Sequence, residues 1–223
     1  MGNWNLIGYL LFLYKISIKG KYNPMNLIFA TSNVHKVKEI ASVLPEGYTV
    51  QSLKDIGFLE ELPETRDTIE GNSLQKAEYL AEKLGVTCFA EDTGLEIEAL
   101  DGRPGVYSAR YAGPEATFSD NVTKVLAEMD GQANRRARFK TVITYFSEGK
   151  YVQFTGLCEG NILEEPRGTE GFGYDPIFVA DGCNLSFAEM RLSEKNQISH
   201  RKKAIDAFLG YLKSSSGQHF IKP

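Results

Sequence analysis

The order of the hydrophobic patterns along this chain is the feature that most restricts its fold. Short apolar runs first alternate with helical periodicity, then runs rich in β-branched and aromatic residues dominate, and a helical segment closes the chain. Strands that alternate with helices indicate a sheet covered by helices. We therefore expect a mixed α/β (α+β) fold, in which helices flank a central elongated mixed sheet and a cleft separates two lobes.

The spacing of apolar residues places the individual elements. Residues 26–31 predict a buried strand, 34–44 a helix, and 69–84 a second helix with Asn72, Lys76 and Lys83 on its polar face. Residues 86–90 and 95–99 predict two strands, and Ser119 is the expected N-cap of a third helix. Further strands are expected at 138–146 and 150–157, which form a hairpin, and at 161–163 and 176–179, before a last helix at 198–212.

Bulk properties narrow the class of protein. A chain of 223 residues is long enough to bury a core, and its net charge of −4 gives no overall basic field, so we do not expect a nucleic-acid partner. The three cysteines are odd in number and widely spaced, which argues against a disulfide framework or a zinc site. We therefore expect a cytoplasmic protein.

The two ends of the chain differ from the rest. The apolar run at residues 4–14 is too short to span a bilayer, and basic residues follow it instead of preceding it. We expect residues 1–24 to be an N-terminal extension outside the fold, 25–213 a single domain of two lobes, and 214–223 a flexible tail, with no membrane partner. A peripheral membrane anchor at 1–24 is the alternative.

Basic residues stand at the start of two expected helices, where the helix dipole disfavours positive charge. Thr31, Ser32 and Asn33 lead into a helix with Lys36 in its first turn, and Ser199 leads into the run His200–Lys203. A bound anion would compensate this charge, so both helix starts are candidate anion sites. The alternative is that these side chains point into water.

Acidic residues mark a second candidate site. Glu91 and Asp92 follow the expected strand at 86–90, and Glu70 stands in the first turn of the helix at 69–84. Carboxylates grouped around one point suit Mg²⁺, which prefers oxygen ligands. The alternatives are a turn at Asp92 and a simple helix-charging role for Glu70.

A glycine-rich segment at 168–176 contains Phe172 and Tyr174, either of which could stack on a flat ring. As a loop alone this signal is weak, and a plain turn before the next strand explains it equally well. The chain has no Gly-x-x-x-x-Gly-Lys-Ser/Thr motif, so a P-loop enzyme is not indicated.

Six segments together carry a resemblance to a known family. They are TSNVHK at 31–36, TIEGNSLQKA at 68–77, EDTGL at 91–95, GRPGVYSARYAG at 102–113, GFGYDPIF at 171–178 and KNQISHR at 195–201. In this order they resemble the inosine/xanthosine triphosphate pyrophosphatase family, which clears non-standard purine nucleotides. The resemblance runs from about residue 25 to 212.

The resemblance implies an Mg²⁺-dependent homodimer that converts the triphosphates of inosine and xanthosine, and their deoxy forms, to the monophosphate and pyrophosphate. Asp92 would be the general base and, with Glu70, a ligand of Mg²⁺. His200 and Arg201 would address the purine 6-position, and residues 107–111 would lie near the interface or the site. The remaining substrate-binding residues would be Thr31, Ser32, Asn33, Lys36, Lys76, Thr93, Phe172, Gly173, Tyr174, Asp175 and Lys195.

The sequence departs from the family pattern at a few positions, and two rival functions remain as alternatives. Ile69 stands for a common Phe, Gly71 for a common Glu and Glu91 for a common Asp. Gly71 is expected to loosen the first turn of its helix. The rivals are a hydrolase of pyrimidine or other modified triphosphates and a nucleotide-sensing module without turnover.

Overall fold

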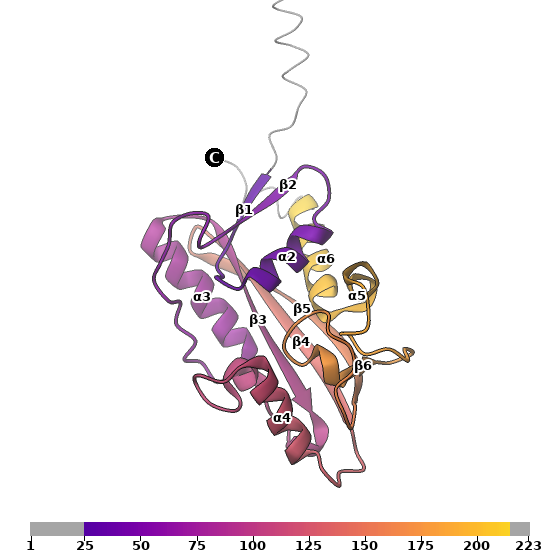
Figure 1. The fold of residues 1–223 in the computed structure, drawn as a ribbon. Coiled ribbons are helices and arrows are strands. Elements are labelled where there is room, and N and C mark those ends of the chain that lie inside the picture. Colours follow the sequence, from indigo (N-terminus) through magenta and orange to yellow (C-terminus); the bar gives the residue numbers. More distant parts are fainter. Residues whose placement is uncertain (1–24, 215–223) are drawn as a thin grey trace, which may run out of the picture.

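A computed structural model describes residues 25–214, so the predictions for residues 1–24 and 215–223 lie outside the described residues (Figure 1). The strands are β1 Met25–Phe29, β2 Tyr48–Ser52, β3 Cys88–Ile97, β4 Arg136–Ser147, β5 Lys150–Ile162 and β6 Phe178–Ala180. The helices are α2 Val34–Val43, α3 Ile69–Leu84, α4 Phe118–Glu128, α5 Leu192–Ile198 and α6 His200–Lys213, with short 3₁₀ turns η1 Glu98–Leu100, η2 Gly105–Arg110 and η3 Asp175–Ile177.

The six strands form one mixed sheet in the order β2-β1-β3-β4-β5-β6. β1 runs parallel to β2 and β3, and the remaining neighbours are antiparallel. Side chains alternate between the faces of a strand, so Thr144 and Tyr145 of β4 point to opposite sides. Thr144 contacts Ser73 of α3, whereas Tyr145 packs on Phe208 of α6, so the two long helices cover opposite faces (Figure 1). The mixed α/β fold is confirmed.

The hydrophobic core is divided between the two ends of the sheet. One cluster joins β3, β4 and β5 to α4 and β6, with Phe139, Phe178 and Phe187 at its centre. Two others fill the opposite end, one under α2 and α6 and one under α3. β4 and β5 are long enough to run through both ends, so they connect two lobes with separate cores (Figure 1).

The two predicted strands at 86–90 and 95–99 are one strand. β3 pairs residue by residue with β4 from Cys88 to Ile97, and so includes the polar segment that was expected to separate two strands. Gly94 lies within the strand and allows the backbone of Gly105 to pack closely against it. A Cβ at Gly94 would lie 2.5 Å from the carbonyl oxygen of Gly105. The prediction that the acidic residues follow the end of a strand was therefore wrong.

Four other boundaries also differ. Thr117, not Ser119, caps α4, because Thr117 and Asp120 form a capping box with reciprocal hydrogen bonds. Residues 161 and 162 complete β5, and the strand expected at 176–179 begins only at Phe178, after η3. Ser199 has an extended backbone that separates α5 from α6, so the last helix starts at His200. Within 25–214 no helix has the length and apolarity needed to cross a membrane.

Candidate active site

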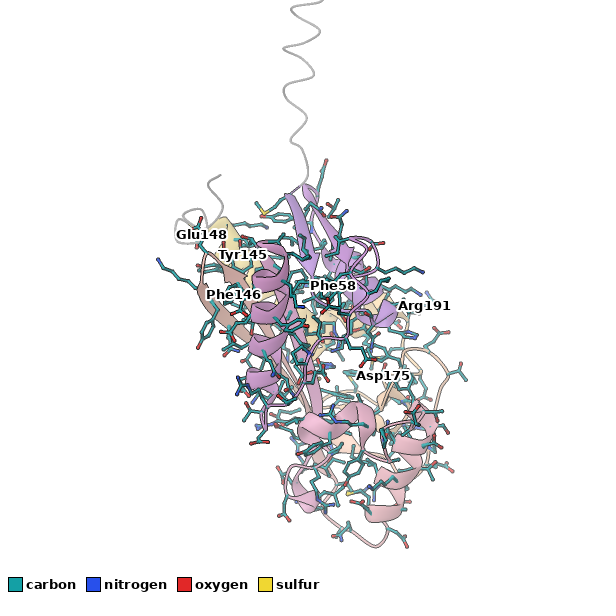
Figure 2. All side chains as sticks on the ribbon, turned by 90° about the vertical axis from the view of Figure 1, so that its left-hand side faces the viewer. Phe58, Tyr145, Phe146, Glu148, Asp175 and Arg191 are labelled. Carbon is teal, nitrogen blue, oxygen red and sulfur yellow. The ribbon has the colours of Figure 1, made fainter. Side chains whose placement is uncertain are left out.

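A cavity of about 420 Å³ lies between the two lobes, a size that suits a small-molecule ligand. Figure 2 shows Asp175, one of its residues, midway between the end that contains Phe58 and the end that contains α4. The cavity brings together nearly all of the predicted site residues, namely Thr31, Ser32, Asn33, Lys36, Lys76, Asp92, Thr93, Phe172, Gly173, Tyr174, Asp175, Lys195, His200 and Arg201. Glu70 is the predicted residue that does not line it.

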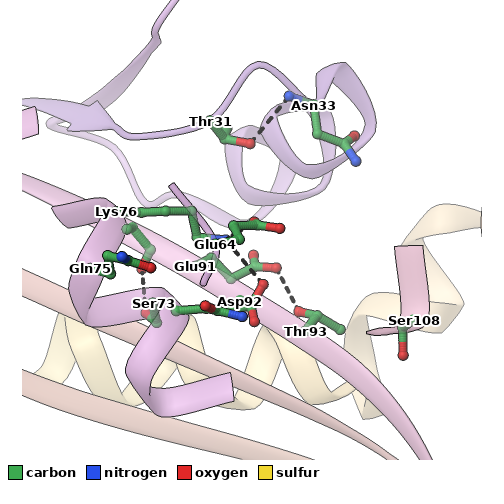
Figure 3. A network of polar contacts seen from close by, with 12 residues as sticks. Thr31, Asn33, Glu64, Ser73, Gln75, Lys76, Glu91, Asp92, Thr93 and Ser108 are labelled. Atoms are coloured by element: carbon green, nitrogen blue, oxygen red, sulfur yellow. Dashed lines mark hydrogen bonds and ion pairs between the residues drawn. The ribbon is translucent and has the colours of Figure 1, made fainter. Parts of the chain in front are cut away.

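The middle of β3 forms the floor of this cavity because its neighbour stops short. β1 pairs with β3 at Phe29 and Phe89 and ends there, whereas β3 continues to Ile97. Successive side chains of a strand point to opposite faces. Asp92 therefore faces α3 and lines the cavity, while Glu91 on the other face contacts Arg201 of α6 and lies behind the cavity wall (Figure 3).

On the α3 side, a lysine lies between two carboxylates. Lys76 Nζ is 2.6 Å from Glu64 Oε1 and 3.0 Å from Asp92 Oδ1 (Figure 3). Lys76 was expected on the polar face of its helix, yet it is buried, because the loop before α3 folds back and brings Glu64 over it. Burial raises the pKa of Asp92 above its ordinary value, and the charge of Glu64 adds to the effect while Lys76 opposes it. Asp92 is thus a stronger base than an exposed aspartate.

Glu70 points elsewhere. Its carboxylate pairs with Lys140 of β4 at 2.6 Å, and neither residue lines the cavity. Glu64, which the sequence did not single out, takes the place beside Asp92 that was expected for Glu70. Within residues 25–214, no group of three or more His, Cys, Asp or Glu side chains is arranged to hold a metal ion. Glu64 and Asp92 are therefore the carboxylates in the best position for shared ligation.

Opposite Asp92, the start of α2 opens onto the cavity. Asn33 caps the helix by accepting hydrogen bonds from the backbone N–H groups of His35 and Lys36, and Thr31 accepts one from Asn33. The first turn contains no acidic residue. The positive end of the helix dipole and the Lys36 ammonium therefore face the same cavity, as expected for an anion site.

On the α6 side, a chain of buried charges replaces the solvent-exposed basic run that was the alternative interpretation. Arg201 binds Glu91 with two hydrogen bonds of 2.8 Å and also contacts Glu39 of α2. Lys195 bridges Glu39 at 2.7 Å and Asp175 at 2.6 Å. Arg201 and Lys36 hold the pKa of Glu91 far below its usual range despite its burial, so Glu91 stays ionised.

The four consecutive residues 200–203 do not act as one basic cluster. Lys202 pairs with Asp206, and Lys203 donates to the carbonyl of Leu157, both away from the cavity. His200 is buried and stacks on Phe139, with ring centroids 4.6 Å apart. Burial and the nearby charges of Arg201 and Lys195 lower its pKa well below the ordinary value, so His200 is neutral. Its buried Nδ1 has no hydrogen-bond partner within residues 25–214.

The glycine-rich segment supplies an aromatic wall. Phe172 lies 5.1 Å from the ring of His35 and 5.9 Å from that of Phe118, and Arg201 lies over it at 5.5 Å. Asp175 fixes the loop by accepting a hydrogen bond from Phe172 N. Gly171 is required there, because it has a φ of 75° and a Cβ would lie 2.1 Å from Asp175 Oδ2.

Glu39, Glu64 and Glu91 are the charged site residues that sequence reasoning did not assign. Glu91 was grouped with Asp92 as an acidic candidate but received no role of its own, and Glu64 lies in a segment without periodicity. Glu39 is buried inside a helix whose polar positions gave no reason to expect burial. The available signal was indirect, because buried cations such as Arg201 require nearby carboxylates.

The fold and the cavity define an α/β protein with a deep cleft for a phosphorylated ligand that carries an aromatic ring. Cations and a helix N-terminus face carboxylates across this cleft, and an aromatic wall closes one end. The chain belongs to the Ham1 family, whose sequence model matches residues 27–211.

The matches to individual relatives extend over nearly the whole length of those relatives. The dITP/XTP pyrophosphatase of Flavobacterium johnsoniae is 51% identical over 188 residues, which are 84% of this chain and 98% of the relative. The dITP/XTP pyrophosphatase of Bacillus subtilis is 47% identical over 182 residues, 80% of this chain and 92% of the relative. Among solved structures, the Ham1 protein of Staphylococcus aureus has a TM-score of 0.76 at 34% identity. The match covers 84% of this chain and 98% of the Staphylococcus aureus chain.

Proposed function

We propose that this chain hydrolyses non-standard purine nucleoside triphosphates, those of inosine and xanthosine and their deoxy forms, to the monophosphate and pyrophosphate. The observation that carries the proposal is the meeting of Asp92, Lys36 and Arg201 in one cavity with Phe172. Relatives at about half identity that bear the name dITP/XTP pyrophosphatase support the same substrate class.

The carboxylates of Asp92 and Glu64 fit Mg²⁺. Both line the cavity, and both contact Lys76 Nζ, at 2.6 and 3.0 Å, so the two carboxylates lie close together. Mg²⁺ is commonly held by one or two carboxylates together with substrate phosphates, and needs no larger protein cage. When bound, it would neutralise charge on the phosphate oxygens. Glu70 would support the site from the outside, through its ion pair with Lys140.

Asp92 is the proposed general base. Its raised pKa makes the carboxylate a better acceptor for the proton of a water molecule that attacks the α-phosphorus. Lys36, Lys76 and the start of α2, with Thr31, Ser32 and Asn33, hold the triphosphate and stabilise the charge that develops on the leaving pyrophosphate. Water supplies the new oxygen on the monophosphate, and the bond from the α-phosphorus to the bridging oxygen breaks.

The base would lie at the other end of the cavity, between the aromatic wall and α6. Arg201 offers a permanent donor, and neutral His200 carries one N–H. A donor aimed at the 6-position matches the keto oxygen of hypoxanthine or xanthine but faces the amino group of adenine, a mismatch that costs about 1–3 kcal/mol. Phe172 stacks on the base, Asp175, Gly173 and Tyr174 shape the sugar site, and Thr93 and Lys195 complete it.

Residues 25–213 form the proposed single catalytic domain, which acts as a cytoplasmic homodimer. Tyr107 of η2 is half exposed and belongs to the segment expected near an interface, which supports the dimer. Sedimentation of the purified chain tests this point, since a monomer at micromolar concentration contradicts it.

The test of the function is a comparison of initial rates with inosine, xanthosine, guanosine and adenosine triphosphates, each with and without Mg²⁺. We expect rapid pyrophosphate release from the inosine and xanthosine forms, and only with Mg²⁺. Preference for pyrimidine triphosphates would favour the first rival function. Binding without turnover would favour the sensing module.

A further inference from the structure

The buried carboxylate of Glu91 lies behind the cavity wall and contacts two residues that line the cavity, Arg201 and Lys36. Its Oε1 accepts a hydrogen bond of 2.8 Å from Arg201 Nη2 and one of 2.7 Å from the Thr93 hydroxyl, and it lies 3.3 Å from Lys36 Nζ. Its Oε2 accepts a further bond of 2.8 Å from Arg201 Nε. One buried oxygen atom therefore holds both a residue proposed to read the base and a residue proposed to hold the phosphates.

The contacts of Arg201 leave it little freedom to move independently. A guanidinium has five N–H donors in a fixed plane. Glu91 takes those of Nε and Nη2, Thr93 shares Nη2 at 3.3 Å, and Glu39 takes one from Nη1. Because the plane is rigid, any displacement of Arg201 by a ligand also displaces the carboxylate of Glu91.

Lys36 depends on the same oxygen. It stands in the first turn of α2, its side chain is 14% exposed, and an ion pair joins it to the buried carboxylate of Glu91. A shift of Glu91 Oε1 therefore changes the position or the strength of the cation that faces the phosphates. Misplacement of reacting groups by about 1 Å can lower a rate by about 100-fold.

We propose that Glu91 is a positioning residue that couples recognition of the base to placement of the triphosphate. A base with a 6-amino group pushes Arg201 away, Glu91 follows, and Lys36 no longer holds the phosphates in line with the attacking water. A mismatched base then lowers turnover as well as affinity. This inference rests on the proposed function and adds to it the route by which base identity reaches the reacting phosphorus.

The first test replaces Lys36, which lies away from the base. We expect Lys36→Gln to slow the hydrolysis of inosine triphosphate more than that of adenosine triphosphate, so that the ratio of their kcat values falls about tenfold. Without coupling, both kcat values fall by the same factor, and this result overturns the proposal. Lys36 is on the cavity rim of α2, so the variant is expected to fold, which thermal unfolding checks.

The second test compares two buried glutamates that share Arg201. Glu39 contacts Arg201 and Lys195, whereas Glu91 contacts Arg201 and Lys36. We expect Glu91→Gln to lower the kcat ratio of inosine to adenosine triphosphate about tenfold. Glu39→Gln is expected to alter the ratio of KM values and to leave the kcat ratio within about twofold. Glu91→Asp keeps the charge and should retain most of the kcat ratio.

The proposal is overturned if Glu91→Gln and Glu39→Gln change the kcat ratio and the KM ratio of the two triphosphates in the same way. If Glu91→Gln does not fold, the Lys36 variant alone decides. Failure of the proposed function would be seen in a different result: the unaltered chain would release no pyrophosphate from inosine triphosphate. A loss that is independent of the base, in variants of an active enzyme, refutes only the coupling.

Discussion

Replacement of Asp92 by asparagine separates its chemical role from its structural one. Asparagine keeps the shape of the side chain but cannot accept a proton from water, and loss of a general base lowers a rate by about 10²–10⁴-fold. At about 1.4 kcal/mol for each factor of ten, this corresponds to roughly 3–5 kcal/mol of transition-state stabilisation. We expect kcat for inosine triphosphate to fall within this range.

The stability of Asp92→Asn should change far less. Lys76 keeps Glu64 at 2.6 Å, so its buried charge retains a partner. We expect a loss of about 1–2 kcal/mol, equivalent to a Tm lower by roughly 2–8 °C in a domain of this size. Pyrophosphate release and thermal unfolding measure the two effects. Glu96→Gln on the same strand, whose partner Arg138 is on the surface, is the control and should change neither.

Asp92→Asn with near-normal turnover would refute the assignment of the base. A variant that fails to fold would refute the claim that Glu64 alone can compensate Lys76. Low turnover in a folded protein is the result that the geometry predicts.

Three further predictions concern the pH profile, the packing and the metal. Burial raises the pKa of Asp92 above the ordinary aspartate pKa of 3.8, and activity should fall as the pH drops through the raised pKa. The acidic limb of the kcat/KM profile should therefore lie above pH 3.8, and a limb below that pH contradicts this. Gly156→Ala should lower the free energy of unfolding by about 3 kcal/mol or more, because a Cβ would lie 2.0 Å from a carbonyl at the start of α6. Gly210→Ala, within α6 and with nothing within 4 Å, should raise it by about 0.5–1 kcal/mol in the same denaturant titration. Glu64→Gln should raise the Mg²⁺ concentration needed for half-maximal rate about tenfold or more, whereas Glu70→Gln should change it less than threefold; the reverse order would return the ligand role to Glu70.

The sequence predicts those elements whose signals are local. The expected limits of α3 at 69–84 are correct, because apolar periodicity coincides with a capping residue at Thr68 and a left-handed Gly85 at the other end. The hairpin of β4 and β5 was also expected, since its turn and its β-branched runs are adjacent in sequence. β3 was divided in error, because its polar centre looks like a turn until the pairing with β4 and the cavity are known.

The arrangement of charges depends on contacts between distant parts of the chain. Arg201 pairs with carboxylates 110 and 162 residues away, so composition and periodicity cannot predict its partners. The motifs indicated which residues gather at the site, but not that each cation already has an acidic partner. For the same reason the sequence favoured Glu70, which begins a helix, over Glu64, which a loop brings to Lys76.

Attack by water on the α-phosphorus beside Asp92 is the central step of the proposed reaction. Hydrolysis of inosine triphosphate in ¹⁸O-labelled water, followed by mass spectrometry of both products, tests it directly. We expect one labelled oxygen in the inosine monophosphate and none in the pyrophosphate. Label in the pyrophosphate, or release of orthophosphate as the first product, would contradict it.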